Sequence, residues 1–231
     1  MSENLIPINI ITGFLGSGKT TLLTEVLKNK NLKNTAVIIN EFGEVSLDHL
    51  LIRHTKENII ELQNGCICCS IQNDLRNTLL DLFYKIKANN SKTVDRIIIE
   101  TTGLADPLPI SDTLLNCTEL QKIYRLENLI TVVDGINGLY TLKNQKEAIR
   151  QVFLASVIVL SKVDLLKDDE KNKLTDSIKA INSKPDLIFS SHGKVPLPVL
   201  FSPKKININK VSWDLNNLLK ETINSHDYNS D

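Results

Sequence analysis

Short apolar runs rich in Ile, Val and Leu alternate along most of the chain with stretches whose apolar residues recur at helical spacing. The runs predict strands at residues 8–11, 35–39, 59–62, 94–99, 129–133, 157–160 and 187–189. Pro7 is expected to keep the first strand from starting before Ile8. Continuous apolar strands separated by helices are typical of parallel sheets covered on both faces. The pattern therefore predicts an α/β fold with a doubly wound, mostly parallel sheet and helices on both faces.

The composition is that of an ordinary globular protein, and it mainly serves to exclude nucleic-acid-binding and membrane-spanning classes of protein. The 231 residues carry 27 Lys and Arg against 27 Asp and Glu, so no overall positive field attracts nucleic acid. No apolar run approaches the ~20 residues of a membrane-spanning helix, and the first residues lack the pattern of a signal peptide. We therefore expect a cytoplasmic protein with neither nucleic acid nor a membrane as its partner. Zero net charge is compatible with self-association.

Residues 13–20, GFLGSGKT, fit the phosphate-binding pattern G-x-x-x-x-G-K-[ST] and lie between a predicted strand and a predicted helix. Glycines let backbone N–H groups approach phosphate oxygens, and the helix N-terminus adds partial positive charge. We expect Lys19 to contact the β and γ phosphates, Thr20 to ligate Mg²⁺ and Thr21 to touch the α phosphate. The nucleotide-binding residues expected in this loop are Gly13, Gly16, Ser17, Gly18, Lys19, Thr20 and Thr21.

A second segment, ETTGLADP, begins at the end of the predicted strand over residues 94–99. Glu100 is expected two strands from the phosphate loop, where a carboxylate can hold the Mg²⁺ shell or position water. Gly103 can offer a bare N–H to the γ phosphate, so that a loop starting there senses its loss. An ordinary carboxylate at a strand end is the alternative reading of Glu100.

A third segment, SKVD at residues 161–164, follows a buried strand, as a base-reading loop does. Asp164 can accept hydrogen bonds from the N1–H and the exocyclic amine of guanine, a readout worth about 1–3 kcal/mol of base discrimination. Lys162 can pack its stem over the base, and Ser161 can add a hydrogen bond. The alternative is a solvated Lys before an Asp that caps a helix.

Three of the four cysteines lie within the segment NGCICC at residues 64–69. Thiolates are soft ligands suited to Zn²⁺ and similar ions. If the chain turns after Cys68, then Cys66, Cys68 and Cys69 can reach one ion, with water, Glu44 or a ligand from a client protein completing the tetrahedron. An open site of three sulfurs suits metal delivery. A redox pair and an inert buried cluster are the alternatives.

The motifs GFLGSGKTT, NEFGEV, NGCICC, ETTGLADP and SKVD, in that order, resemble those of the CobW-type P-loop GTPases. These form a metallochaperone family related to the GTPases that insert nickel into hydrogenase and urease, and the likeness is greatest to its YjiA-like branch. The resemblance implies GTP hydrolysis with Mg²⁺, binding of Zn²⁺ or Co²⁺ at the CxCC motif, and coupling of metal delivery to the nucleotide state. It assigns catalysis to Lys19, Glu100 and Gly103, Mg²⁺ to Thr20 and Glu100, guanine to Lys162 and Asp164, and the transition metal to the three cysteines.

Two features depart from the family pattern. Many members have Asn where Ser161 stands, so a weaker guanine contact is expected. Members usually carry a second domain, whereas this sequence predicts a GTPase domain over residues 1–205 followed only by a helix and tail over 206–231. The expected partners are a client metalloprotein or metal-cofactor pathway and, in a nucleotide-dependent homodimer, a second copy. A small-molecule P-loop kinase and a non-catalytic, nucleotide-regulated metal-binding module remain as alternatives.

Overall fold

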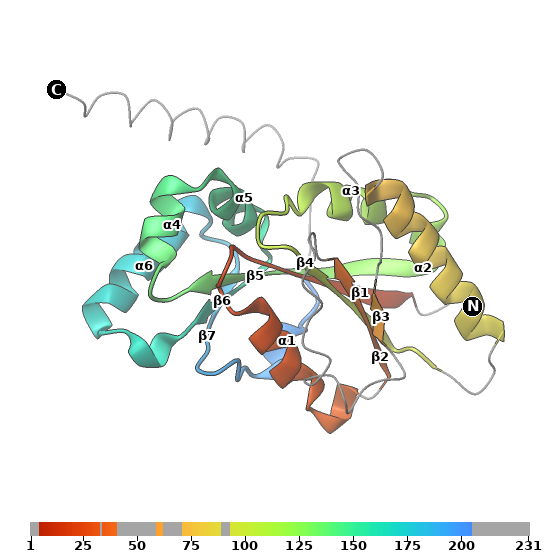
Figure 1. The fold of residues 1–231 in the computed structure, drawn as a ribbon, viewed down its shortest axis with the longest axis horizontal. Coiled ribbons are helices and arrows are strands. Elements are labelled where there is room, and N and C mark those ends of the chain that lie inside the picture. The colour runs from red at the N-terminus through yellow and green to blue at the C-terminus, as the bar shows by residue number, and fades with distance from the viewer. Residues whose placement is uncertain (1–4, 33, 41–58, 62–70, 89–92, 205–231) are drawn as a thin grey trace.

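The computed structural model describes residues 5–32, 34–40, 59–61, 71–88 and 93–204 (Figure 1). The strands are β1 (Ile6–Thr12), β2 (Thr35–Asn40), β3 (Ile59–Glu61), β4 (Arg96–Thr101), β5 (Tyr124–Asp134), β6 (Val157–Ser161) and β7 (Asp186–Phe189). The helices are α1 (Lys19–Leu27), α2 (Ile71–Ala88), α3 (Leu108–Asn116), α4 (Gly138–Asn144), α5 (Lys146–Leu154), α6 (Asp168–Ile181) and α7 (Leu197–Leu200). Helices thus separate most of the strands, as the sequence pattern predicts.

The strands form one sheet in the order β3-β2-β4-β1-β5-β6-β7, and every neighbouring pair is parallel. Alternate strand residues face opposite sides, so each strand contributes to two apolar layers. On one face α1 and α7 pack over residues such as Ile98 and Val132. On the other face lie α2 and α3, and beside them α4, α5 and α6 (Figure 1). The predicted doubly wound α/β fold with helices on both faces is confirmed.

The first strand starts earlier than the sequence predicts, because β1 contains Pro7. The Ile6 N–H donates to the Ile123 carbonyl on the β5 side, so position 7 is directed to the other side of the strand. On that side lies β4, and its pairing with β1 begins only at Ile8. The missing N–H of Pro7 therefore removes no hydrogen bond from the sheet.

The expected distance of Glu100 from the phosphate loop is wrong. Its strand, β4, lies directly beside β1, with Glu100 in register with Ile11. The chain places β2 on the far side of β4, a crossover that hydrophobic periodicity does not reveal. Glu100 is thereby brought next to the start of the phosphate loop.

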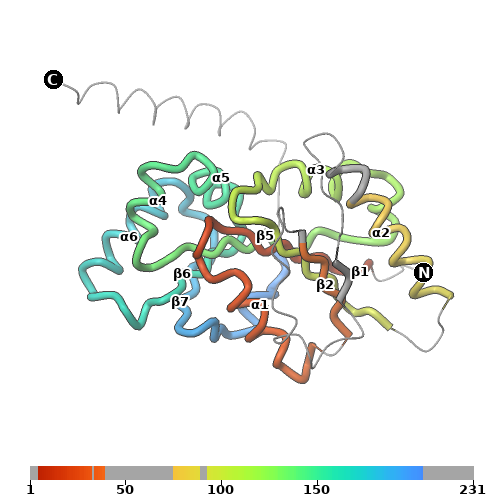
Figure 2. Tube along the Cα trace, in the orientation of Figure 1, coloured from red at the N-terminus to blue at the C-terminus, as the bar shows by residue number. Residues whose placement is uncertain are grey.

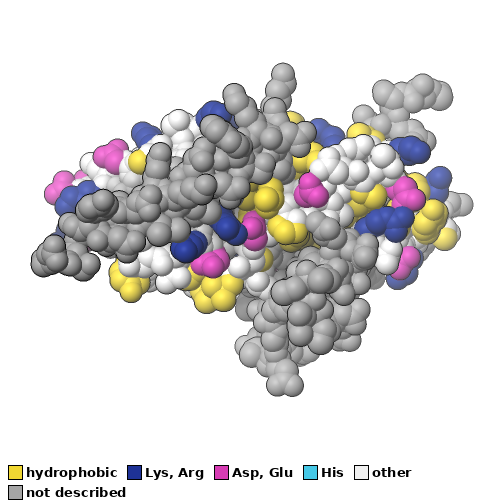
Figure 3. Space-filling model, turned by 90° about the horizontal axis from the view of Figure 1, so that it is seen from above, with side chains coloured by type: hydrophobic (Ala, Val, Ile, Leu, Met, Phe, Trp, Pro, Cys, Tyr) yellow, Lys and Arg dark blue, Asp and Glu magenta, His cyan; other side chains and the backbone are white. Residues whose placement is uncertain are grey.

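Charged residues of both signs are mixed on one face of the described part of the chain. Viewed onto the face that carries α2 to α5, Lys, Arg, Asp and Glu side chains are interspersed (Figure 3). This mixture fits the zero net charge of the sequence. Among the described residues, no helix combines the length and the apolarity needed to cross a membrane.

Candidate functional site

The loop between β1 and α1 has a shape that requires glycine. Gly13, Gly16 and Gly18 have φ angles of 142°, 70° and 96°, a region that other L-residues rarely adopt. At Gly13 space is also limiting, since a Cβ atom there would lie 2.2 Å from the Val132 carbonyl oxygen. The loop therefore runs directly against β5 and leads into α1, whose first residue is Lys19.

Lys19 folds back over this loop. Its Nζ donates to the carbonyl oxygens of Gly13, at 2.9 Å, and Phe14, at 3.1 Å, and the side chain is buried. A buried ammonium needs such partners, because desolvation without hydrogen bonds is costly. The cation is thus held at the loop where the motif expects the β and γ phosphates.

Thr20 and Glu100 form the polar centre beside the loop. The Thr20 hydroxyl donates to Glu100 Oε1 at 2.7 Å, and Glu100 is 5% exposed at the end of β4. Hydroxyl and carboxylate oxygens are ligands suited to Mg²⁺. The donor set therefore fits the ion expected here, and the neighbouring strands β1 and β4 bring the two side chains together.

The turn after β4 lies against the phosphate loop. The Ala105 N–H donates to the Thr102 carbonyl at 3.2 Å, which closes a turn around Gly103. A Cβ atom on Gly103 would lie 2.8 Å from the backbone nitrogen of Leu15, so only glycine allows this approach. The residue expected to sense the γ phosphate is therefore adjacent to the loop that would hold it.

Ser161 ties the predicted base loop to the phosphate loop. Its hydroxyl is 2.7 Å from the Ser17 carbonyl oxygen and 3.2 Å from that of Val133. The side chain is buried at the end of β6. The serine side chain reaches both carbonyl oxygens, although it lacks the amide group of the Asn that many family members have at this position.

Lys162 makes a second connection between the two loops. It adopts a left-handed conformation, with φ 55°, and its Nζ donates to the Gly16 carbonyl at 3.1 Å and to Asp134 Oδ2 at 2.8 Å. Burial raises the pKa of Asp134, but hydrogen bonds from Lys162, Ile136 and Asn137 outweigh it, so that the net pKa is lowered. Asp134 consequently stays ionised and holds the ammonium.

Asp164 is oriented by a residue that the sequence analysis did not single out. The Ser191 hydroxyl donates to Asp164 Oδ1 at 2.7 Å, and this bond contributes most to lowering the pKa of the carboxyl. One third of the Asp164 side chain remains exposed. Asp134 ends β5 and Ser191 follows β7, so both lie at the edge of the sheet that carries the phosphate loop. This position after a predicted strand is the only sequence signal that could have identified them.

The metal ligands predicted from the sequence, Cys66, Cys68, Cys69 and Glu44, lie outside the described residues. The strands that precede them are neighbours, since β2 pairs in parallel with β3. The segments that follow these strands thus start from the same edge of the sheet. Within the described part of the chain, no group of three or more His, Cys, Asp or Glu residues is placed to hold a metal ion.

The parallel sheet with a glycine-rich loop opening α1 defines a P-loop nucleotide-binding fold. A model of the CobW/HypB/UreG nucleotide-binding domain matches residues 7–189. The zinc chaperone YjiA of Escherichia coli is 40% identical over 199 residues, which are 86% of this chain and 62% of that protein. The zinc-regulated GTPase metalloprotein activator 1 of Dictyostelium discoideum is 29% identical over 244 residues, 90% of this chain and 50% of that protein.

A solved structure agrees with these matches. The crystal structure of Zn(II)-bound YjiA GTPase from Escherichia coli superposes with a TM-score of 0.66 at 35% identity, over 86% of this chain and 62% of that one. The chain belongs to the CobW/HypB/UreG family, which confirms the resemblance drawn from the motifs. It spans less than two thirds of the length of these relatives.

Proposed function

We propose that this protein binds and hydrolyses GTP and couples the nucleotide state to the delivery of a transition metal. The observation that carries the nucleotide part is the double tie between the two predicted loops: Ser161 and Lys162 both bond to carbonyls of the phosphate loop. These ties fix Asp164 relative to the phosphates, so that one ligand can span both ends. The names of two relatives, a zinc chaperone and a zinc-regulated GTPase, support the metal part.

In the proposed reaction a water oxygen attacks the γ phosphorus of GTP, the bond to the β–γ bridging oxygen breaks and the water loses a proton to solvent, giving GDP and phosphate. Lys19 stays on the β and γ oxygens as charge moves toward the bridging oxygen. Gly103 donates its N–H to the γ phosphate, and Glu100 positions the water. Mg²⁺, held through Thr20 and Glu100, supplies positive charge that neutralises the phosphate oxygens when bound.

Glu100→Gln tests the catalytic part. The amide keeps the size of the side chain and an oxygen for the Thr20 hydroxyl, but it loses the negative charge. We expect GDP affinity within about threefold of wild type and a fall in kcat of about 100-fold, the scale of a misplaced reacting group. Phosphate release measured in single-turnover assays with GTP and ATP checks both the reaction and its base preference. Transfer of phosphate to a small acceptor instead of water would favour a kinase.

For the metal, we propose that Cys66, Cys68 and Cys69 bind Zn²⁺ or Co²⁺ as cargo, with Glu44 as an additional ligand. The pairing of β2 with β3 supports this set, because the segment containing Glu44 and the cysteine segment follow neighbouring strands. The segment containing Glu44 follows β2, and β2 is paired with β4, the strand that carries Glu100 near its end. A bound γ phosphate can therefore tighten the metal site through this segment.

Co²⁺ titration tests the coupling, because thiolate ligation gives a charge-transfer absorption band. We expect the band in reduced protein, tighter binding with a non-hydrolysable GTP analogue than with GDP, and a reciprocal increase in analogue affinity when metal is present. Cys68→Ser should weaken metal binding and leave GDP affinity unchanged. Equal Co²⁺ affinity in both nucleotide states would contradict delivery driven by GTP.

The proposed partners are a client metalloprotein and a second copy of this chain, in the cytoplasm. Leu15 and Leu104 support a homodimer across the nucleotide site, because Leu15 belongs to the phosphate loop, Leu104 to the turn beside it, and the two are 59% and 54% exposed. Within this proposal residues 1–205 form the GTPase domain and residues 206–231 a helix and tail. Light scattering with GDP and with a GTP analogue tests whether the dimer depends on the nucleotide.

A further inference from the structure

The turn after β4 is held from one side by a side chain of α5. Gln151 is fully buried, and its Nε2 donates to the carbonyl oxygens of Gly103, at 3.2 Å, and Ala105, at 3.1 Å. These carbonyls belong to the turn that the Ala105 N–H closes on Thr102. One amide group thus holds two carbonyls of the segment that follows Glu100.

The two bonds also set the direction of the N–H groups in this turn. In a trans peptide the C=O of one residue and the N–H of the next point in opposite directions. Because the Gly103 carbonyl points to Gln151, the Leu104 N–H is turned away from α5. The Thr102 carbonyl points into the turn, so the Gly103 N–H points out of it. Gln151 therefore sets the direction of the Leu104 N–H and holds in place the turn that carries the Gly103 N–H.

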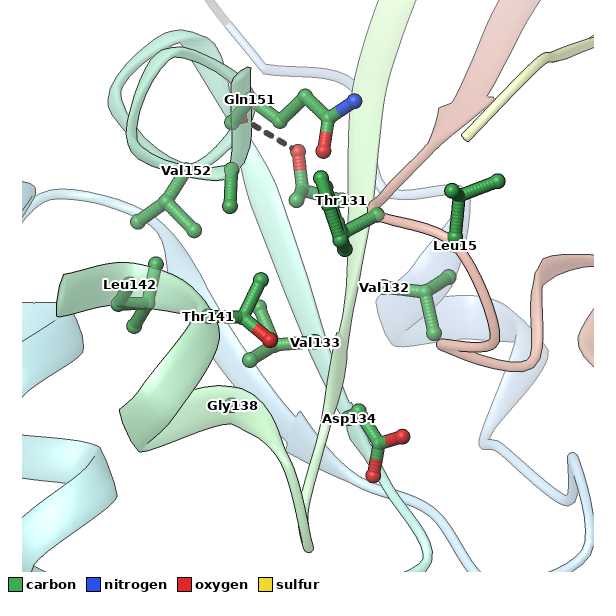
Figure 4. Close-up of a pocket in the computed structure, with 12 residues that line it drawn as sticks. Leu15, Thr131, Val132, Val133, Asp134, Gly138, Thr141, Leu142, Gln151 and Val152 are labelled. Atoms are coloured by element: carbon green, nitrogen blue, oxygen red, sulfur yellow. Dashed lines mark hydrogen bonds between the residues drawn. The ribbon is translucent and has the colours of Figure 1, made fainter. Parts of the chain in front are cut away.

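The phosphate loop confines the same turn from another side. Leu15 approaches Gly103 so closely that no Cβ atom fits between them. The turn lies beside the phosphate loop and below α5 in Figure 2. In Figure 4 the Gln151 side chain reaches across Thr131 toward Leu15, above a small cavity that both residues line. Gly103 thus contacts the phosphate loop on one side and the Gln151 side chain of α5 on the other.

Gln151 is itself anchored to the sheet. The Thr131 hydroxyl of β5 donates to its backbone carbonyl at 2.7 Å. Its neighbour Arg150 forms a second tether to the turn, a 3.1 Å ion pair with Asp106. Both members of that pair are partly exposed, and such pairs are worth roughly 0–1 kcal/mol. The buried amide is therefore the stronger of the two tethers.

The chemistry of Gln151 argues against a purely packing role. Its Oε1 is buried and has no hydrogen-bond partner among the described residues. A buried, unsatisfied polar atom costs on the order of 1–3 kcal/mol, a cost that an apolar side chain at this position would avoid. What the amide gains in return is the pair of bonds to Gly103 and Ala105.

We propose that Gln151 is a positioning residue for GTP hydrolysis, which holds the turn Thr102–Ala105 so that the Gly103 N–H meets the γ phosphate. This inference rests on the proposed GTPase function. Gln151 acts through Gly103 and does not touch the nucleotide. Since GDP has no γ phosphate, loss of the amide spares GDP binding and lowers kcat.

Gln151→Met tests the proposal, because it keeps the length and approximate volume of the side chain and removes the donor. The matched control is Asn182→Leu. The Asn182 amide also donates to carbonyls, those of Val152, Phe153 and Ala155 at the end of α5, but the structure shows no bond from it to the turn. Gln151→Met should lower kcat about tenfold, since displacements of about 1 Å cost up to 10²-fold, and leave KM and GDP affinity unchanged. Asn182→Leu should lower the melting temperature and leave kcat unchanged.

A wild-type kcat in folded Gln151→Met, or an equal loss of kcat in Asn182→Leu, would overturn the proposal. If Gln151→Met does not fold, Gln151→Asn decides, because it keeps an amide but shortens the side chain by one methylene, so that the donor no longer reaches the carbonyls of Gly103 and Ala105. A selective loss of kcat of about tenfold there supports the proposal, and an unchanged kcat overturns it. Absence of GTP hydrolysis by the wild-type protein would instead refute the proposed function itself.

Discussion

The two ends of the candidate nucleotide site are built in different ways. At the phosphate end the shape comes from the backbone, with positive φ angles at Gly13, Gly16 and Gly18. At the base end it comes more from side chains, and of the three residues with positive φ angles there, Lys162, His192 and Gly193, two are not glycines. Asp164 leaves a third of its side chain exposed, whereas Lys19 is buried.

This difference predicts how each end responds to change. A backbone cradle tolerates few added atoms, because neighbouring carbonyls cannot move away without breaking the sheet. Side chains at an exposed loop can be exchanged at a modest cost in stability, with the effect appearing in specificity. Substitutions at the phosphate end should therefore reduce folding or nucleotide binding strongly, whereas those at the base end should change base specificity by a smaller amount.

The largest effect is expected for Gly13→Ala. The new Cβ atom would lie 2.2 Å from the Val132 carbonyl oxygen and force a φ of 142° on an alanine. We expect little folded protein, or folded protein that no longer binds GDP. Gly16→Ala is the matched control, because nothing lies within 4 Å of its Cβ position and only the positive φ remains, a cost of roughly 1–2 kcal/mol. Thermal unfolding and fluorescent GDP binding measure both; similar losses in the two variants would show that space at β5 is not what limits Gly13.

At the base end, Asp164→Asn should change specificity and leave the fold intact. The amide has one acceptor oxygen in place of two, and its NH₂ donor would face one of the guanine N–H groups; the bidentate readout it replaces is worth about 1–3 kcal/mol. We expect the ratio of GDP to ADP affinity to fall by about tenfold, at the lower part of that range because the site is partly exposed. Competition binding measures the ratio. An unchanged ratio would mean that residues 161–164 do not read the base.

The smallest effect is expected for Ser191→Ala, which removes the hydroxyl that orients Asp164. That hydrogen bond is the main cause of the lowered pKa of Asp164, so the pKa should rise toward its ordinary value in the variant. Because the folded-state pKa is below the ordinary one, the carboxylate contributes to stability above the ordinary pKa, and this contribution is lost as pH falls through the lowered pKa. NMR titration of the carboxyl carbon measures the shift. Guanine preference should fall only about two- to threefold, the effect of one weak, exposed hydrogen bond.

Features that depend on neighbouring residues can be recognised in the sequence without the structure. The phosphate loop could be found because its glycines, Lys19 and Thr20 are contiguous, and their conformation follows from local backbone freedom. The strand runs and the α/β class followed from hydrophobic periodicity, and the structure confirms them. The cysteine motif was found in the same way and stays a prediction, since it lies outside the described residues.

Which distant residues meet at the site depends on the packing of the whole fold. The position of β4 beside β1 depends on the order in which strands insert into the sheet, and periodicity is the same for either order. Ser191 on Asp164, Asp134 on Lys162 and Gln151 on Gly103 are contacts between segments far apart in the chain. Their residue types are common, so no local pattern marks them. A polar side chain acquires its role from the group that the fold places within hydrogen-bonding distance, and that distance is set by the packing of whole strands and helices.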